Sequence, residues 1–227
     1  MFDNPLLTEE GQTKLFRLMS ETNVRVESLT CDNLMQSPVH KNGTQGRTSK
    51  LEFLKMVTLL PKVDHFIIVW PLVDEGSIDS IDELQVLQSF VLDVIPFLRE
   101  FKIKIAFETQ MSPSENELFL SNFPSDVVGL NLDIGNSASN GFSILEDYDL
   151  NGDRIFNIHI KDRLFGGKTI PLGKGDVIWP DFKIITKKYS GPMIFQSARI
   201  DNQTEEMTIL SYLNFCQESS IFNYSTT

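Results

Sequence analysis

The 227-residue chain contains 41% apolar and 22% charged residues, an ordinary globular mixture with enough material for one large domain. Its 20 Lys and Arg against 31 Asp and Glu give a formal net charge of −11, which would repel a polyphosphate and argues against general nucleic-acid binding. Two cysteines cannot supply a disulfide framework, and the absence of a signal-peptide pattern or a long apolar run predicts a cytoplasmic protein with no membrane contact.

Six short apolar runs, five of which end in a polar residue and one in a proline, predict buried parallel strands. In chain order they are residues 25–32 (RVESLTCD), 65–71 (HFIIVWP), 102–109 (KIKIAFET), 128–136 (VGLNLDIGN), 155–162 (IFNIHIKD) and 192–199 (PMIFQSAR). They are rich in Ile, Val, Leu and Phe, and residues typical of turns flank them.

The segments between these runs have helical periodicity. The first predicted helix begins at Thr8, an N-cap residue followed by Glu9 and Glu10 in the first turn. Further helices are predicted at residues 48–60, 80–101 and 204–216, with shorter ones near residues 114–122, 143–148 and 181–189. Strands that alternate with helices in this way predict an α/β fold.

Both a doubly wound open sheet and a (β/α)8 barrel of the TIM type fit this alternation. Polar residues at or near the C-terminal ends of the predicted strands separate the two, namely Asp32, Glu108, Asp133, His159 and Gln196. In a barrel these ends converge on one mouth, whereas strands at opposite edges of an open sheet are too far apart to share a site. The pattern favours the barrel, although only six of its eight strands are visible.

Three of these polar residues point to metal chemistry. Glu108, Asp133 and His159 offer two carboxylates and an imidazole on three successive predicted strands, and this ligand set suits Mn²⁺, Mg²⁺, Zn²⁺ or Co²⁺. Gln196 could add a weaker amide oxygen. Such an ion polarises the carbonyl and hydroxyl of a sugar, and a carboxylate at the same site can then move the adjacent proton.

Several motifs in the second half of the chain resemble one known family. They are NLDIGN (residues 131–136), NIHIKDR (157–163), PLGKGDVIWPDF (171–182) and GPMIFQSAR (191–199), preceded by NPLL at residues 4–7. In this order they resemble the sugar phosphate isomerase/epimerase family, whose fold is a xylose isomerase-like TIM barrel. The resemblance covers most of the chain and is densest between residues 130 and 199.

The resemblance implies a site made of four metal ligands. Glu108, Asp133 and His159 fill the first three positions, and Gln196 stands where the family has a second glutamate. The family's two glutamates also form its catalytic acid/base pair, so Glu108 and Gln196 occupy the catalytic positions, yet an amide cannot titrate. Asn136 is a second departure, because many relatives have a histidine there. One base suffices for a 1,2-shift of carbonyl and hydroxyl, so aldose–ketose isomerisation is favoured over epimerisation.

The resemblance has further implications for the substrate and for the extent of the barrel. Lys161, Arg163 and Arg199 are predicted to contact a small sugar or sugar phosphate, and Lys161 is a candidate second base. Relatives have a strand, a helix and another strand before a segment like NPLL. We therefore expect residues 1–227 to be a single barrel domain that lacks the first two strands, an N-terminally truncated form. Its unpaired strand edges would favour a homo-oligomer.

These residues fit four functions to different degrees. The first is a metal-dependent sugar or sugar-phosphate isomerase/epimerase with Glu108 as the base. A lyase of the inositol-dehydratase type shares the same metal site, and a non-catalytic or inactive truncated relative that binds a sugar fits Gln196; both stay open. An abasic-site endonuclease of the same superfamily is rejected, because its three-zinc cluster needs many histidines and this chain has three.

Overall fold

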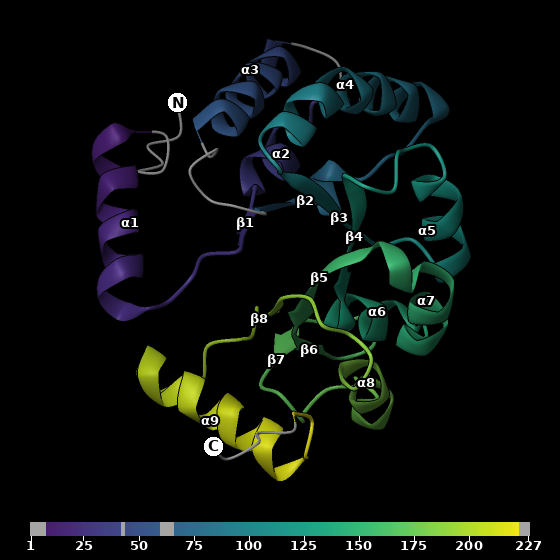
Figure 1. The fold of residues 1–227 in the computed structure, drawn as a ribbon. Coiled ribbons are helices and arrows are strands. Elements are labelled where there is room, and N and C mark those ends of the chain that lie inside the picture. Colours follow the sequence, from purple (N-terminus) through teal and green to yellow (C-terminus); the bar gives the residue numbers. More distant parts are fainter. Residues whose placement is uncertain (1–7, 42–43, 60–65, 223–227) are drawn as a thin grey trace. The chain divides into compact units, whose positions relative to one another are not determined.

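The computed structural model of the chain describes residues 8–41, 44–59 and 66–222 (Figure 1). The NPLL segment and the first residue of the predicted strand at 65–71 lie outside these ranges. The helices are α1 (Glu9–Thr22), α2 (Asp32–Gln36), α3 (Thr44–Leu59), α4 (Ile81–Glu100), α5 (Pro113–Leu120), α6 (Ile134–Asn140), α7 (Ile144–Asn151), α8 (Trp179–Thr186) and α9 (Glu205–Glu218). The strands are β1 (Ser28–Thr30), β2 (Ile67–Leu72), β3 (Lys104–Thr109), β4 (Val128–Asp133), β5 (Ile155–Ile160), β6 (Asp162–Arg163), β7 (Thr169–Ile170) and β8 (Met193–Phe195).

The main sheet follows the order of the chain, β1-β2-β3-β4-β5-β8, and β6 and β7 form a separate antiparallel pair. The strands β1 to β4 pair in parallel, with Phe107 opposite Leu130, and β5 pairs in parallel with β8, with His159 opposite Ile194. Parallel neighbours end at the same edge of a sheet, so polar residues that follow neighbouring strands gather there. The six strands predicted from the apolar runs are all found.

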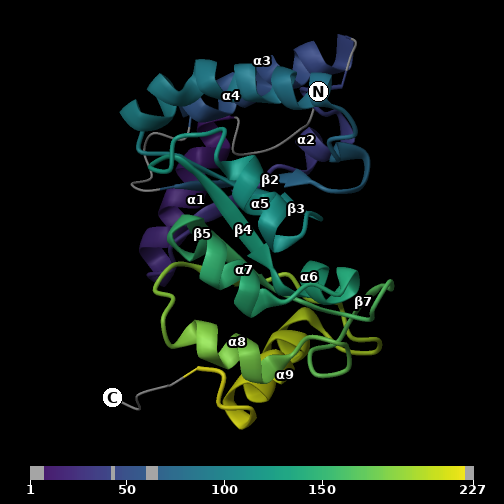
Figure 2. The ribbon, with the colours of Figure 1, turned by 90° about the vertical axis from the view of Figure 1, so that its right-hand side faces the viewer.

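The chain forms two compact units, and the boundary between them falls within β4. Residues 128–130 of this strand belong to the first unit and residues 131–133 to the second. The first unit comprises residues 1–109 and 120–130. Aromatic rings form its core: Phe53 of α3 lies 5.1 Å from Trp70 of β2 and 5.8 Å from Phe90 of α4, between ring centroids. Figures 1 and 2 both show α3 and α4 side by side, as this packing requires.

The second unit holds residues 110–119 and 131–227. Trp179 of α8 packs edge-on against Phe215 of α9 with a centroid distance of 4.8 Å, so these helices lie side by side in Figures 1 and 2. A buried carboxylate ties α5 to α7, because Asp147 accepts hydrogen bonds from the amides of Asn116 (3.2 Å) and Asn151 (2.8 Å). Burial raises the pKa of Asp147, against the effect of these two hydrogen bonds.

Helices α1, α4 and α9 each begin at a serine or threonine that caps the helix with its side chain. Thr8 accepts a hydrogen bond from the backbone of Gly11, and Ser80 does the same for Glu83 at the start of α4. Thr204 caps α9 through the backbone of Met207. Each cap satisfies a backbone N–H that has no partner inside its helix. The predicted N-cap at Thr8 is confirmed.

Several predicted boundaries are wrong. The run at residues 128–136 ends as a strand at Asp133, where the Asp133 side chain caps helix α6 and the predicted strand residues 134–136 form its first turn. The strands predicted at 25–32 and 192–199 are shorter in the structure, where β1 and β8 have three residues each. Asp32 lies two residues after the end of β1, where it opens the unpredicted helix α2 and is exposed.

Within the described ranges, no helix is both long and apolar enough to cross a membrane.

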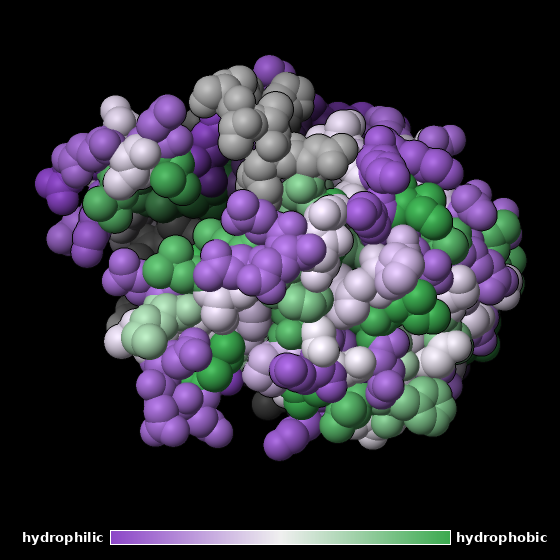
Figure 3. All heavy atoms as spheres, turned by 90° about the horizontal axis from the view of Figure 1, so that it is seen from below, coloured by the Kyte–Doolittle hydropathy of each residue, from purple (hydrophilic) through white to green (hydrophobic). Residues whose placement is uncertain are grey.

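Several large apolar side chains are exposed, among them Met207, Ile209 and Leu210 of α9. On the face drawn in Figure 3, hydrophobic and hydrophilic residues are interspersed.

Candidate metal centre

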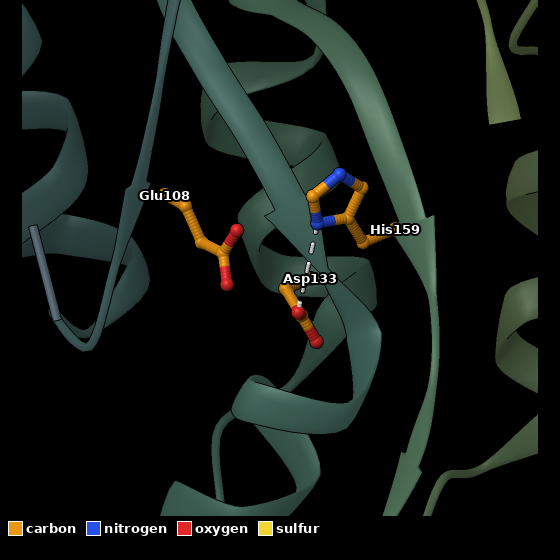
Figure 4. A group of neighbouring side chains, drawn as sticks. All are labelled: Glu108, Asp133 and His159. Atoms are coloured by element: carbon orange, nitrogen blue, oxygen red, sulfur yellow. Dashed lines mark ion pairs between the residues drawn. The ribbon is translucent and has the colours of Figure 1, made fainter. Parts of the chain in front are cut away.

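A row of buried polar side chains follows one face of β4 and β5. Because side chains alternate along a strand, Asn131 and Asp133 share one face of β4, and Asn157 and His159 share one face of β5, with Lys161 next in line. All five residues are at most 9% exposed. Figure 4 shows Asp133 and His159 at neighbouring strand ends, joined by the dashed line of their ion-pair contact. The second unit therefore concentrates ligand-type side chains in its interior.

The two oxygens of Asp133 serve different partners. Oδ1 accepts a hydrogen bond from the backbone N–H of Asn136 at 2.8 Å and so caps helix α6. Oδ2 lies 2.6 Å from Lys161 Nζ and 3.9 Å from His159 Nδ1. The carboxylate is thus fixed by the helix on one side and presents its other oxygen to the polar interior.

A chain of two asparagines orients His159. Asn157 donates through Nδ2 to Asn131 Oδ1 at 2.6 Å, and Asn131 Nδ2 lies 3.0 Å from His159 Nδ1. With the amides assigned in this way, Nδ1 accepts the hydrogen bond and the ring proton belongs on Nε2. Sequence reasoning missed both asparagines, although the alternating patterns N-x-D and N-x-H-x-K place them on the same faces as the candidate ligands.

Lys161 and Gln196 meet beside this row. Lys161 Nζ donates to Gln196 Oε1 at 2.9 Å in addition to its contact with Asp133. Gln196 directly follows β8, and its backbone N–H donates to Ile160 O at 3.1 Å, which continues the pairing of β8 with β5. The structure therefore brings Gln196 to Lys161.

Glu108 belongs to the first unit, where it is the penultimate residue of β3 and is buried. It follows Phe107, the residue paired with Leu130 of β4, so β3 and β4 end at the same edge of the sheet. Figure 4 draws Glu108 together with Asp133 and His159.

The two arginines predicted to contact substrate have other partners within the protein. Arg163 donates to Asn136 Oδ1 at 2.8 Å and to the backbone oxygen of Gly167 at 2.7 Å and 3.1 Å. The Arg199 side chain is 90% exposed and lies 3.4 Å from Glu205 at the start of α9.

The glycine-rich segment after β7 is organised by one buried carboxylate. Asp162 accepts hydrogen bonds from the backbone N–H groups of Gly173 (2.8 Å), Gly175 (3.0 Å) and Val177 (3.3 Å). A phosphate-binding loop would aim such N–H groups at its ligand. Here they converge on a side chain of the protein, so this segment is a structural turn.

The residues of the row fit a divalent cation in chemistry and spacing. A carboxylate oxygen and an imidazole nitrogen are ligands for Zn²⁺, Mn²⁺ and related ions, with bond lengths of about 2.0–2.2 Å. Asp133 Oδ2 and His159 Nδ1 are 3.9 Å apart, which is within the span of two such bonds. The cap of α6 is on Asp133 Oδ1 and leaves Oδ2 for an ion, whereas the lone pair of His159 Nδ1 accepts from Asn131, so an ion at Nδ1 would displace that hydrogen bond.

Comparison with known families agrees with this fold. The family described as "Xylose isomerase-like TIM barrel" matches residues 3–211. The chain belongs to this family. The predicted resemblance is thereby confirmed, and the six-stranded sheet with its alternating helices is a partial (β/α)8 barrel of the TIM type. No curated protein sequence matches the chain significantly.

Solved structures of this barrel type are similar to the chain at low sequence identity. A xylose isomerase domain protein from Planctomyces limnophilus has a TM-score of 0.78 and 16% identity, covering 96% of this chain and 86% of that one. D-psicose 3-epimerase from Clostridium cellulolyticum H10, solved with D-tagatose, has a TM-score of 0.71 and 14% identity, covering 92% and 82%. The IOLI protein, solved with a zinc atom, has a TM-score of 0.70 and 16% identity, covering 95% and 87%.

Proposed function

We propose that the protein is a metal-dependent sugar isomerase in which Glu108, Asp133 and His159 hold a divalent cation. The observation that carries this proposal is the pair of buried ligand atoms, Asp133 Oδ2 and His159 Nδ1, which lie 3.9 Å apart; an ion would take the place of the Asn131 contact on Nδ1. Glu108 supports it as a third buried donor at the end of the adjacent strand. Similar barrels named as epimerases, and one solved with zinc, are consistent with this chemistry.

The chain's own residues would have separate roles in the reaction. When bound, a divalent cation polarises the carbonyl and hydroxyl of a sugar and makes the adjacent C–H more acidic. Glu108 takes this proton and returns it to the neighbouring carbon on the same face. Before an ion binds, Asn131 keeps the His159 ring in one orientation, and the cap of helix α6 does the same for Asp133.

One base limits the reaction type. Epimerisation removes a proton from one face and delivers it to the other, which usually requires two bases, and the amide of Gln196 cannot serve as the second. We therefore favour interconversion of an aldose and a ketose over epimerisation. Gln196→Glu tests this step: the one-base argument is wrong if the unmodified chain already epimerises a ketose and loses that activity on this change.

The contacts of the cations favour an uncharged sugar over a sugar phosphate. Lys161 is paired with Asp133 and Gln196, and Arg163 is bonded to Asn136 and Gly167. A phosphate would have to compete with these partners for either cation. A sugar hydroxyl needs only one hydrogen bond, from an N–H of Lys161 or Arg163 that these contacts do not use. Arg199 is the more available cation, because its pairing with Glu205 is solvent-exposed.

The first experiment measures metal in the purified chain by elemental mass spectrometry, beside the His159→Ala variant and a His40→Gln control. We expect about one Mn, Zn, Co or Mg per chain that persists in the control and disappears in His159→Ala. The metal-loaded chain is then incubated with ketoses and their phosphates in deuterium oxide. Isomerisation converts a ketose to an aldose, and deuterium enters at carbon where the proton held by Glu108 exchanges with the solvent before it is returned. A chain that takes up no metal after soaking in Mn²⁺ contradicts the proposal.

A sugar-binding protein without turnover is the second candidate, favoured by the amide at Gln196. Its expected result is saturable sugar binding with no deuterium incorporation. A lyase of the inositol-dehydratase type would instead release water and give an unsaturated or keto product. A cytoplasmic location and a homo-oligomer remain predictions from the sequence.

A further inference from the structure

The ammonium of Lys161 contacts the same carboxylate oxygen that is proposed to bind a metal. Lys161 Nζ lies 2.6 Å from Asp133 Oδ2, the oxygen that faces His159, while Oδ1 is occupied by the cap of α6. The Lys161 and Asp133 side chains are only 11% and 1% exposed. Their opposite charges therefore meet where water screens them little.

The local backbone leaves room for Lys161 at this place. Gly135, in the first turn of α6, lies so close that an added Cβ would stand 2.9 Å from Lys161 Cγ and 3.0 Å from Lys161 O. Any larger residue would push against the lysine stem. Together with the hydrogen bond to Gln196 Oε1, this packing fixes the ammonium between an acidic and a neutral partner.

We propose that Lys161 is a resident cation that competes with the metal for Asp133, and that Gln196 anchors the ammonium and does not bind the metal. The inference rests on the proposed metal site. A divalent ion bound to Oδ2 at about 2.1 Å would lie within about 5 Å of the ammonium, so the two charges repel in a buried place. Lys161 must leave Oδ2 for the ion to bind, and its second partner, Gln196, can keep the displaced ammonium hydrogen-bonded.

This arrangement gives Gln196 a function that a metal-binding glutamate could not perform in the same way. A carboxylate at this position would add a negative charge to the site and a fourth ligand for the ion. The neutral amide adds neither, and its oxygen already accepts from Lys161. The metal affinity of the chain is therefore set low by its own lysine.

The test compares Mn²⁺ binding by isothermal titration calorimetry in the intact chain and in the variants Lys161→Met, Lys161→Gln and Lys168→Met. Lys168→Met is the matched control, because Lys168 is exposed next to β7 and its loss changes the net charge equally. We expect Mn²⁺ to bind both Lys161 variants at least about tenfold more tightly and the control within about twofold. Lys161→Gln removes the charge but keeps a side-chain N–H that can donate to Asp133. It can therefore be measured in place of Lys161→Met if that variant does not fold.

A second readout separates competition from a purely structural role. Without metal, Lys161→Met should melt at a lower temperature than the intact chain, because Asp133 loses its counter-charge, and saturating Mn²⁺ should raise its Tm by more than that of the intact chain. Equal or weaker Mn²⁺ binding in both Lys161 variants overturns the inference and leaves the proposed metal site standing. If neither the intact chain nor the variants take up Mn²⁺, the inference and the metal site both fail.

Discussion

Arg163 donates a hydrogen bond from Nη1 to the side-chain oxygen of Asn136 at 2.8 Å, and this contact joins β6 to helix α6. Two further bonds from the same guanidinium to Gly167 O close the turn between β6 and β7. The neutral amide oxygen at Asn136 is a suitable acceptor for a guanidinium, whereas a protonated imidazole would repel it.

The first prediction concerns the stability that Arg163 provides. Arg163→Met should lower the free energy of unfolding by about 1.5–3 kcal/mol, the usual range for hydrogen bonds that involve a charged group. Urea denaturation measures this change. Arg199→Met is the matched control, because the Arg199 side chain is largely exposed, and it should leave the urea midpoint unchanged. Equal midpoints for both variants would show that Arg163 does not hold the turn.

The second prediction separates the two oxygens of Asp133. Asp133→Asn retains an acceptor that caps α6, since asparagine is an effective N-cap, but it removes the negative charge beside Lys161 and His159. We expect loss of metal binding and a decrease of about 3 kcal/mol in the free energy of unfolding without metal, because a buried ammonium loses its partner. Elemental mass spectrometry and urea denaturation measure the two effects. Retained metal would exclude Asp133 as a ligand.

The third prediction tests the turn that Asp162 organises. A Cβ at Gly175 would overlap the Asp162 carboxylate and would stand 2.7 Å from Arg163 O, so Gly175→Ala should destabilise the chain by about 1–3 kcal/mol. Gly152→Ala is the control, because Gly152 has a helical backbone (φ −53°, ψ −40°) and its nearest neighbour, the Tyr148 ring, is 3.6 Å away. This variant should be as stable as the parent or more stable by about 0.4–1 kcal/mol. Thermal melts of the two variants provide the comparison.

The fourth prediction concerns His40, whose ring is buried and whose Nε2 lies 3.1 Å from Ser77 O. Burial lowers the pKa of His40 below its ordinary 6.5, against raising effects from the Ser77 contact and from Glu83 and Asp79, and with a lowering effect from Lys41. The unfolded chain therefore binds this proton more readily than the folded chain. The contribution of His40 to the free energy of unfolding is constant above pH 6.5 and falls as the pH drops from 6.5 through the folded-state pKa.

His40→Gln removes this titration while keeping an amide that can donate to Ser77 O. Urea denaturation at pH 7.5 and pH 5.5 should show a larger loss of stability on acidification in the parent than in the variant. The difference between the two chains isolates His40 from other titrating groups, including the buried Asp147. The same pH dependence in both chains would contradict the prediction.

The alternation of strands and helices could be predicted because it depends on local patterns. Runs rich in β-branched and aromatic residues formed the sheet, and Thr8 before two glutamates marked the start of α1. The boundaries were less predictable where one residue serves two elements. Asp133 ends a strand and caps a helix, and the apolar Ile134 that follows fits either structure.

Only those residues of the candidate site that lie at or near strand ends could be predicted from the sequence. Asp133 and His159 were found because each lies at or near the end of a buried strand, where a polar residue is conspicuous. Asn131 and Asn157 lie inside strands and become visible only once their face is known to be polar. The contact between Lys161 and Gln196 depends on β5 pairing with β8 in one register, with Ile160 opposite Phe195, which no local pattern specifies.

The cap that Asp133 provides restricts which residues the position can accept. Glutamate would keep the charge, but its longer side chain would misplace the acceptor at the start of α6. Serine, threonine or asparagine would cap the helix and lose the anionic oxygen. Histidine would offer a metal ligand and repel Lys161 when protonated. Only aspartate meets the demands of the helix, the lysine and the cation together, so efforts to retune this centre by mutation have more freedom at Gln196 than at Asp133.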